Sequence, residues 1–281
     1  MGIKAALESG AHDARPVGLL QSHWLRRTAR ADHRGLNALT AAHTQAIPFE
    51  NLDVLLGRGI DLAPDAVFDK LVRRRRGGYC FEHNGLLLEV LTALGFAVRP
   101  LSARGRILPP RGQIPPRTHM LLEVQIGGER WLTDVGVGAL SLTSAIRFAI
   151  DEEQHTPHEP RRIVREADHW LHQARLGDIW TDVYELTGEE MPPIDREVGN
   201  WYTSAHPRSH FRNLLIVARA APDGGRISLR DGELKRRSRH GRAETQTIES
   251  AEALLTILRT EFDLEFPAGT RFSQASCQAA V

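Results

Sequence analysis

A cysteine at the expected start of a buried helix is the residue of this sequence best suited to nucleophilic chemistry. Cys80 follows a run of arginines and the pair Gly77–Gly78, which would let the chain turn sharply and leave the sulfur accessible. Apolar residues at three- and four-residue spacing over 86–94 predict a helix with Cys80 in or just before its first turn, ended by Gly95. Unpaired N–H groups at a helix N-terminus and nearby arginine charge favour thiolate over thiol.

Two other readings of Cys80 stay open at this point. A cysteine at the edge of an apolar helix is usually a small buried hydrophobe. Cys80 and His83 also form a C-x-x-H pair, which one helix face would present together. Zinc takes four protein ligands, or three and a water, and the sequence holds no second pair at that spacing. We therefore expect no metal.

A predicted β-hairpin supplies the two residues that would activate a cysteine. The pair Gly127–Gly128 favours a two-residue primed turn, and the resulting register places Leu121 opposite Asp134. His119 shares the face of Leu121 and is the diagonal neighbour of Asp134, within reach of a carboxylate–imidazole hydrogen bond. An imidazole oriented by a carboxylate is what keeps a cysteine ionised. The sequence thus predicts a catalytic triad of Cys80, His119 and Asp134.

The overall composition excludes several classes of protein. The chain has 281 residues, a formal net charge of +1 and two cysteines, Cys80 and Cys277. This charge gives no global field for nucleic acid or a membrane surface, and four arginines at 73–76 fit a helix C-terminus better than a nucleic-acid patch. Two cysteines exclude a disulfide framework and fit a reducing compartment. With no signal peptide or membrane span in the pattern, we expect a cytoplasmic protein.

The hydrophobic period divides the chain into a helical first third and a strand-rich remainder. Residues 1–16 are expected to form a loose extension, short helices to follow from Val17 to His43, and Pro64 to open another helix. Strand patterns then begin after Gly95.

Turn, strand and helix patterns also predict the structure of the connecting segments and of the C-terminal part. Residues 49–64 resemble a turn-rich connection, and residues 141–198 a mixture of strands and polar loops. A further strand lies within 211–220, and an acidic first turn predicts a helix over 249–262. Four histidines of the polar region are expected to face solvent: His155, His158, His169 and His172.

Four stretches of the chain resemble the bacterial arylamine N-acetyltransferases. They are FENLDVLL at 49–56, RRRGGYCFEHNGL at 74–86, RTHMLLEV with LTDVGVG, and NWYTSAHPRSHF at 200–211. The likeness covers roughly residues 20–270. The R-G-G-x-C-x-E-x-N signature, followed by T-H and D-V-G at suitable distances, is highly specific.

This resemblance implies an α+β fold with a papain-like cysteine-triad architecture. An N-terminal helical domain at 17–95 would carry the nucleophile, and a central antiparallel β-barrel at 96–198 the histidine and the aspartate. An α/β lid would occupy 199–281. The helix-then-strand order of the hydrophobic pattern agrees with that arrangement.

The resemblance also implies an activity. Family members transfer acetyl from acetyl-CoA to the nitrogen of an arylamine, arylhydroxylamine or hydrazine through a cysteine thioester, so coenzyme A and a small amine are the expected partners. The expected state is a monomer or homodimer. By motif, the family's catalytic residues fall on Cys80, His119 and Asp134, the triad predicted above.

The remaining site residues rest on the resemblance alone. The residues expected near coenzyme A are Thr118, Gly136, Gly138, Tyr202, His206 and Pro207. Those expected near the acceptor are Phe49, Val137 and Phe211. The family commonly has phenylalanine where this chain has Val137, which predicts a roomier acceptor pocket.

Two rival functions remain. A thiol hydrolase or transglutaminase-like enzyme would use the same triad and pass the acyl group to water or to a peptide amine. A catalytically silent binding protein would keep Cys80 as a structural residue.

Overall fold

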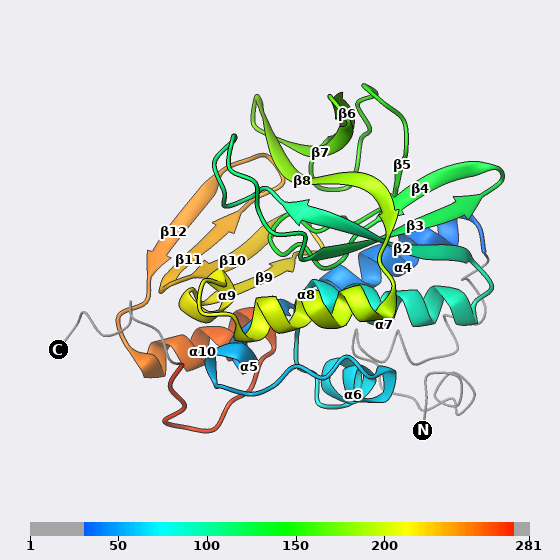
Figure 1. The fold of residues 1–281 in the computed structure, drawn as a ribbon. Helices are drawn as coiled ribbons and strands as arrows, with labels where there is room; N and C mark the ends of the chain where they lie inside the picture. Colours follow the sequence, from blue (N-terminus) through cyan, green and yellow to red (C-terminus); the bar gives the residue numbers. More distant parts are fainter. Residues whose placement is uncertain (1–30, 273–281) are drawn as a thin grey trace.

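The computed structural model describes residues 31–272, which form two antiparallel sheets and the helices around them (Figure 1). The expectations for the first 30 residues and for Cys277 lie outside the described residues. In the described part, no helix is long and apolar enough to cross a membrane.

The larger sheet has seven strands in the order β5-β4-β3-β2-β8-β7-β6. Bridges from Ile150 to Ile163 and from Gln154 to Arg161 connect the chain after β5 to β6, so the sheet nearly closes into a barrel. Its strands are β2 (Ala97–Gly105), β3 (His119–Ile126), β4 (Glu129–Thr133), β5 (Ile146–Arg147), β6 (Arg161–Glu166), β7 (His169–Leu176) and β8 (Ile179–Glu190). The antiparallel barrel implied by the resemblance is therefore present in a nearly closed form.

Strand β3 is buried on both faces, which allows it to serve two cores. Met120 and Leu122 pack in the cluster that contains α7 (Cys80–Ala93). Leu121 points to the opposite face, into the barrel interior. Helix α7 and the barrel core therefore share one strand.

Helix α7 lies against β2 and β3, with smaller helices beneath it. The predicted start at Cys80 and stop at Gly95, which has a φ of +84°, are both confirmed. The helix opened by Pro64 is also present as α6 (Pro64–Phe68), and it continues as a π-helical turn, η1 (Asp69–Arg73). Before them lies α4 (His33–Ala46), capped by the Asp32 side chain.

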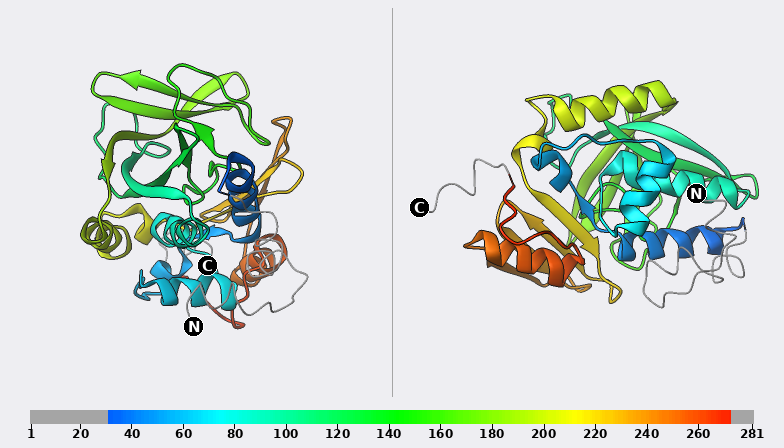
Figure 2. Two further views of the ribbon diagram at one scale, coloured as in Figure 1. Left: turned by 90° about the vertical axis from the view of Figure 1, so that its right-hand side faces the viewer. Right: turned by 90° about the horizontal axis from the view of Figure 1, so that it is seen from below.

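The smaller sheet has five strands in the order β1-β9-β10-β11-β12. Helix α10 (Ala251–Phe262), predicted from the sequence, packs its apolar face against this sheet (Figure 2). The strands are β1 (Phe49–Glu50), β9 (Ile216–Ala220), β10 (Arg226–Arg230), β11 (Glu233–Arg237) and β12 (Ala243–Thr247).

The interpretation of residues 49–64 as a turn-rich connection is wrong for its first part. Strand β1 pairs with β9, and α5 (Leu52–Leu55) follows it. The cause is long-range: Asn51 donates to the carbonyls of Phe211 and Leu214, so a partner far along the chain orders this segment.

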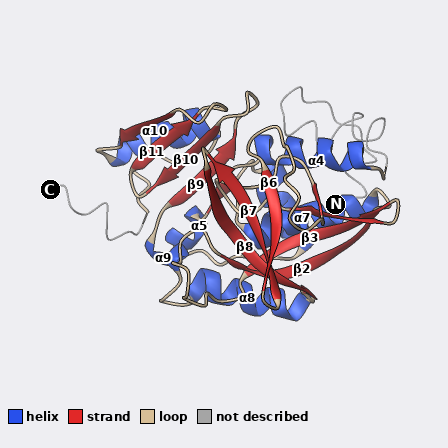
Figure 3. Ribbon diagram, turned by 90° about the horizontal axis from the view of Figure 1, so that it is seen from above, coloured by secondary structure: helices blue, strands red, loops and turns tan. Residues whose placement is uncertain are grey.

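Helix α8 (Pro193–Ala205) was not predicted, although Ile194, Val198 and Trp201 recur at four- and three-residue spacing. These three large apolar residues face solvent. Figure 3 shows α8 and α4 on opposite sides of the barrel strands. Helix α8 runs across the expected boundary at 198 and leads to α9 (His210–Asn213). The division into three domains stays a prediction.

Candidate active site

Cys80 occupies the first turn of α7, and the residues before it are held by a buried carboxylate. The Tyr79 backbone N–H donates to Oε2 of Glu82 at 3.0 Å, and Lys70 Nζ lies 2.7 Å from Oε1 of the same side chain. Glu82 is 1% exposed, so this capping interaction is shielded from water. It fixes the angle at which the chain enters the helix.

The two glycines before Cys80 are required for close packing, not for a special backbone angle. Neither has a positive φ. A Cβ on Gly77 would lie 2.1 Å from the Pro48 carbonyl oxygen, and one on Gly78 would lie 2.5 Å from Oε2 of Glu82. Instead of the sharp turn expected from the sequence, residues 77 and 78 form a closely packed segment between β1 and α7.

The Cys80 thiol is buried beside the histidine predicted to act on it. Only 4% of Cys80 is exposed, and Sγ donates to the Thr118 carbonyl oxygen at 3.6 Å. His119 follows directly, and Ala103 of β2 pairs with it. The sulfur and the imidazole are therefore brought together by residues 118 and 119.

The predicted hairpin and its register are confirmed. Ile126 pairs with Glu129 across Gly127 and Gly128, which have φ values of +61° and +83°. His119 Nε2 lies 2.7 Å from Oδ2 of Asp134, and both residues are buried.

The surroundings of His119 and Asp134 favour the charged form of both side chains. Burial lowers the pKa of His119, but the charge and hydrogen bond of Asp134, aided by Cys80, outweigh it and raise this pKa to about 10. Burial raises the pKa of Asp134, but the His119 charge and three hydrogen bonds hold it below its ordinary value. At neutral pH the pair is therefore an imidazolium and a carboxylate.

Asn84 is a site residue that the sequence reasoning did not single out. Its Nδ2 donates to Oδ1 of Asp134 at 2.9 Å and to the Met120 carbonyl at 2.7 Å, while its Oδ1 accepts from the Val135 N–H at 3.1 Å. The signal was present, since Asn84 ends the R-G-G-x-C-x-E-x-N signature, four residues after Cys80 and hence on the same helix face.

Gly136 and Gly138 serve packing in this part of the chain. A Cβ on Gly136 would lie 2.6 Å from Cα of Cys80, so the backbone after Asp134 packs directly against Cys80. Gly138, with a φ of +87°, lies against the ring of Phe49.

The acceptor residues expected from the resemblance fall into two groups. The rings of Phe49 and Phe211 lie 6.0 Å apart, and Phe211 also contacts Tyr79. Val137 is half-buried and packs against the barrel core instead. The structure therefore brings the two phenylalanines together and places the valine in the separate cluster of the barrel core.

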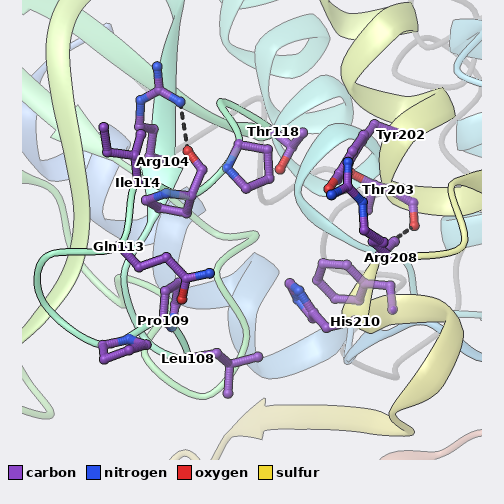
Figure 4. A pocket seen from close by; sticks show the side chains of 15 residues that line it. Arg104, Leu108, Pro109, Gln113, Ile114, Thr118, Tyr202, Thr203, Arg208 and His210 are labelled. Atoms are coloured by element: carbon purple, nitrogen blue, oxygen red, sulfur yellow. Dashed lines mark hydrogen bonds between the residues drawn. The ribbon is translucent and has the colours of Figure 1, made fainter.

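A cavity of about 630 Å³ opens beside Thr118, next to the cysteine (Figure 4). Thr118 and Tyr202 line it, whereas Gly136 and Gly138 lie behind Cys80 and near Phe49. Among the remaining residues expected near coenzyme A, His206 stacks on Tyr202 with the ring centroids 4.5 Å apart. Pro207 is the next residue along the chain, and its carbonyl accepts from Asn213.

Two histidines expected in solvent are buried, which corrects that prediction. His172 is 0% exposed, and its ring packs at a tilt of 52° against Tyr184, whose own ring lies 5.3 Å from that of His119. Burial, followed by the charge of Arg161, holds the pKa of His172 well below its ordinary value, so it is neutral. His158 is also buried and shares a hydrogen bond with Thr143.

The C-x-x-H pair does not form a metal site. His83 hydrogen-bonds to His43 at 2.8 Å and to the Pro48 carbonyl at 3.2 Å, so both of its ring nitrogens are occupied within the protein. No group of three or more acidic, histidine or cysteine side chains suited to a metal occurs within residues 31–272.

Comparison with known proteins gives a consistent result. A model of the N-acetyltransferase family matches residues 33–270. An arylamine N-acetyltransferase of Mycolicibacterium smegmatis is 44% identical over 242 residues, covering 84% of this chain and 86% of the relative. One of Escherichia coli is 39% identical over 229 residues, covering 82% of this chain and 81% of the relative.

Solved structures of arylamine N-acetyltransferases are also similar to this chain in fold. The Salmonella typhimurium arylamine N-acetyltransferase superposes with a TM-score of 0.84 at 34% identity, covering 99% of this chain and 97% of that one. The Mycobacterium marinum enzyme in complex with CoA gives 0.81 at 39% identity, covering 85% and 91%.

Proposed function

The chain belongs to the arylamine N-acetyltransferase family, and from this premise we propose that Cys80, His119 and Asp134 carry acetyl from acetyl-CoA to an amine by a ping-pong mechanism. Membership makes the protein an acyltransferase with acetyl-CoA as co-substrate. The observation that supports the triad is the 2.7 Å contact between buried His119 and Asp134, with the Cys80 thiol beside them.

The first half-reaction begins with a proton already on the imidazole. Because Nε2 of His119 faces Asp134, Nδ1 is the ring nitrogen left to face Cys80. The Cys80 thiolate attacks the thioester carbon, and backbone N–H groups at the start of α7 stabilise the oxyanion. The coenzyme A sulfur leaves with the electron pair of the broken bond, takes the His119 proton, and acetyl-Cys80 remains.

The second half-reaction restores the site. The amine nitrogen attacks acetyl-Cys80 and passes a proton to neutral His119. The carbon–sulfur bond breaks, Cys80 leaves as thiolate, and the imidazolium beside it stabilises the charge. The acceptors we propose are arylamines, arylhydroxylamines and hydrazines.

Intact-mass measurement tests this scheme. Acetyl-CoA alone should add one acetyl group to the wild type and none to Cys80→Ala, and an arylamine should then remove it as the N-acetyl product. Acetate release at the same rate with and without amine would identify a thiol hydrolase instead. Absence of any acetyl adduct under turnover conditions would contradict the covalent mechanism.

Val137 is proposed to widen the acceptor side of the site. It is half-buried next to Gly138, whose backbone lies against Phe49. We expect Val137→Phe to lower kcat/KM for bulky anilines relative to small ones, measured with acetyl-CoA in excess. An unchanged ratio of the two substrates would contradict this proposal.

A further inference from the structure

Three polar side chains inside the barrel have hydrogen-bonding atoms without a partner in the part of the chain that the structure describes. These atoms are Nε and Nη1 of Arg161, both ring nitrogens of His172, and the hydroxyl oxygen of Tyr184. All three residues are 0% exposed. Buried polar groups are nearly always hydrogen-bonded, so a group of unpaired ones in one place indicates a missing partner.

The pairing of β6, β7 and β8 brings these three side chains together. His172 of β7 lies directly opposite Tyr184 of β8, with the ring centroids 4.6 Å apart. His172 also pairs with Ile163 of β6, two residues after Arg161, so Arg161 is its diagonal neighbour on the same face of the sheet. Ile163 and Tyr184 belong to the barrel core, so this face is the barrel interior. The three side chains thus form a row across neighbouring strands (Figure 1).

Positive charge is in excess at the Arg161 end of this row. Nη2 of Arg161 donates to Oε2 of Glu159 at 3.0 Å. The same carboxylate pairs with Arg226 at 2.7 Å and with Arg237. Burial lowers the pKa of Arg161 to about 10, with Glu159 opposing the effect, so the guanidinium is charged at neutral pH. One carboxylate therefore faces three guanidinium groups, and a buried charge without a full counter-charge is costly.

The other ionisable groups beside the row supply no negative charge to Arg161. His119, whose ring lies 5.3 Å from that of Tyr184, pairs with Asp134, so these two charges compensate each other. His172 is neutral, because burial and then the Arg161 charge lower its pKa.

The unpaired atoms of the row are mostly hydrogen-bond donors. A guanidinium has no acceptor, and a neutral imidazole has one N–H. Burial and then the Asp134 charge raise the pKa of Tyr184 well above its ordinary value, although the Arg161 charge opposes them, so the hydroxyl keeps its proton. An anion accepts from all these donors and also supplies negative charge, whereas a water molecule is neutral.

We propose that Arg161, His172 and Tyr184 bind a chloride ion inside the barrel. The ion accepts from the free N–H groups of Arg161, from one ring N–H of His172 and from the Tyr184 hydroxyl. Complete burial of all three residues favours a monatomic ion over a larger organic anion. Such an ion joins three strands of the barrel, and its role is separate from the acetyl transfer proposed for Cys80.

Urea unfolding at pH 7.5 tests the proposal, with gluconate replacing chloride at constant ionic strength. An ion that binds only the folded protein raises the folding equilibrium constant by the factor 1 + [L]/Kd. Between zero and 0.2 M chloride, this constant should rise at least about tenfold, which corresponds to a Kd of about 20 mM or below. No acetyl donor enters the measurement, so its result does not depend on the proposed function.

Tyr184→Phe removes one donor and keeps the ring. The Kd for chloride should then rise about tenfold, the loss of one charge-assisted hydrogen bond. Thr187→Val is the matched control, because it also removes a hydroxyl without a described partner from β8, but from a half-buried residue. It should keep the wild-type response to chloride. An equal response in the wild type and Tyr184→Phe would place the chloride effect elsewhere and overturn the proposal.

Crystals of the wild type grown with bromide in place of chloride locate the ion directly, even if a variant fails to fold. An anomalous-scattering peak in contact with both Arg161 and Tyr184 is expected. Density for a water molecule at this place, without anomalous signal, would overturn the proposal. So would a wild-type folding equilibrium constant that does not change with chloride.

Discussion

Asp134 concentrates three interactions in one buried carboxylate. It accepts from His119, from Asn84 and from the Gly136 N–H, at distances of 2.7 to 2.9 Å. Three donors around a buried carboxylate keep it ionised, and the ionised carboxylate in turn keeps the proton on His119. The protonation state of the His119 imidazole is therefore determined by the Asp134 carboxylate.

Asp134→Asn tests this dependence. The amide preserves shape but loses the charge, so we expect the rate of Cys80 acetylation to fall by about 10²- to 10⁴-fold, as for the corresponding change in serine triads. Rapid-quench mass spectrometry measures that rate, and thermal unfolding checks that the variant is folded. A loss under threefold in a folded variant would contradict the role given to Asp134.

The raised pKa of His119 also gives a pH dependence with a definite sign. The folded protein holds this proton more tightly than the unfolded chain, so its stabilising effect is complete below about pH 6.5. It is lost as the pH rises from there to about 10. Acetylation by a thiolate–imidazolium pair should decline over the upper end of that range, and the decline should begin at a lower pH in Asp134→Asn. Identical alkaline limbs in the two proteins would argue against it.

At the scale of elements, the contact between α7 and the loop after β4 controls the placement of the sulfur. Gly136→Ala would push a methyl group to within 2.6 Å of the Cys80 Cα, so one backbone must move. A displacement of about 1 Å is enough to reduce catalysis by about 10²-fold. We expect that loss in kcat/KM for acetyl-CoA.

Gly85→Ala is the matched control for this prediction. Gly85 lies inside the same helix, and a Cβ there would meet nothing within 4 Å. It should keep full activity and gain about 0.5–1 kcal/mol of stability. Equal losses in the two variants would show that the contact with Cys80 is not the cause.

The pair His43 and His83 makes the junction of α4 and α7 sensitive to acid. Burial lowers the pKa of His83 to about 4 and holds that of His43 well below its ordinary value. The unfolded chain binds these protons more readily, so stability falls as the pH drops from about 6.5 towards 4. For His83 alone the loss at pH 5 is about 2 kcal/mol.

Urea unfolding at pH 7.5 and pH 5 measures this loss. His83→Gln retains a donor and an acceptor but does not titrate, so its stability should depend less on pH than that of the wild type. Equal pH slopes in the two proteins would rule out His83 as the source.

The sequence predicted those elements whose patterns are local. The Gly127–Gly128 turn and the two-residue period of its strands determine the register that joins His119 to Asp134. By contrast, α8 was missed although Ile194, Val198 and Trp201 have helical spacing, and that spacing could not show that these three side chains face solvent. Strand β1 depends on a partner strand far along the chain, and the burial of His172 depends on which face of its strand is covered in the fold, and a local pattern contains neither.

At the scale of the whole molecule, Glu159 joins the two sheets. It lies just before β6 and forms ion pairs with Arg161 of β6, Arg226 of β10 and Arg237 of β11. Burial raises its pKa, but the charges of Arg226 and Arg161 outweigh this effect and lower it far below the ordinary value. One carboxylate therefore compensates three guanidinium groups between the barrel and the smaller sheet.

Glu159→Gln should be strongly destabilising, by about 3–5 kcal/mol, because it leaves buried arginines without a counter-charge. The wild type should lose the same stabilisation as the pH falls below about 4.5, since the folded carboxylate resists protonation. Denaturant unfolding measures both effects. The exposed pair of Glu129 with Arg147 provides the control, and Glu129→Gln should cost less than about 1 kcal/mol. Similar costs for the two variants would refute this account.

The position of Asn84 on the same helix as Cys80 has a consequence for motion. Asn84 and Cys80 are one helical turn apart. The Asn84 side chain is hydrogen-bonded to the Asp134 carboxylate, to the Met120 carbonyl on strand β3, and to the Val135 N–H. If α7 shifts relative to the barrel, these hydrogen bonds should make Asp134 and strand β3 shift with it. Cys80 and Asp134 should therefore keep their relative positions, and their alignment for the proposed reaction does not require the rest of the protein to be rigid.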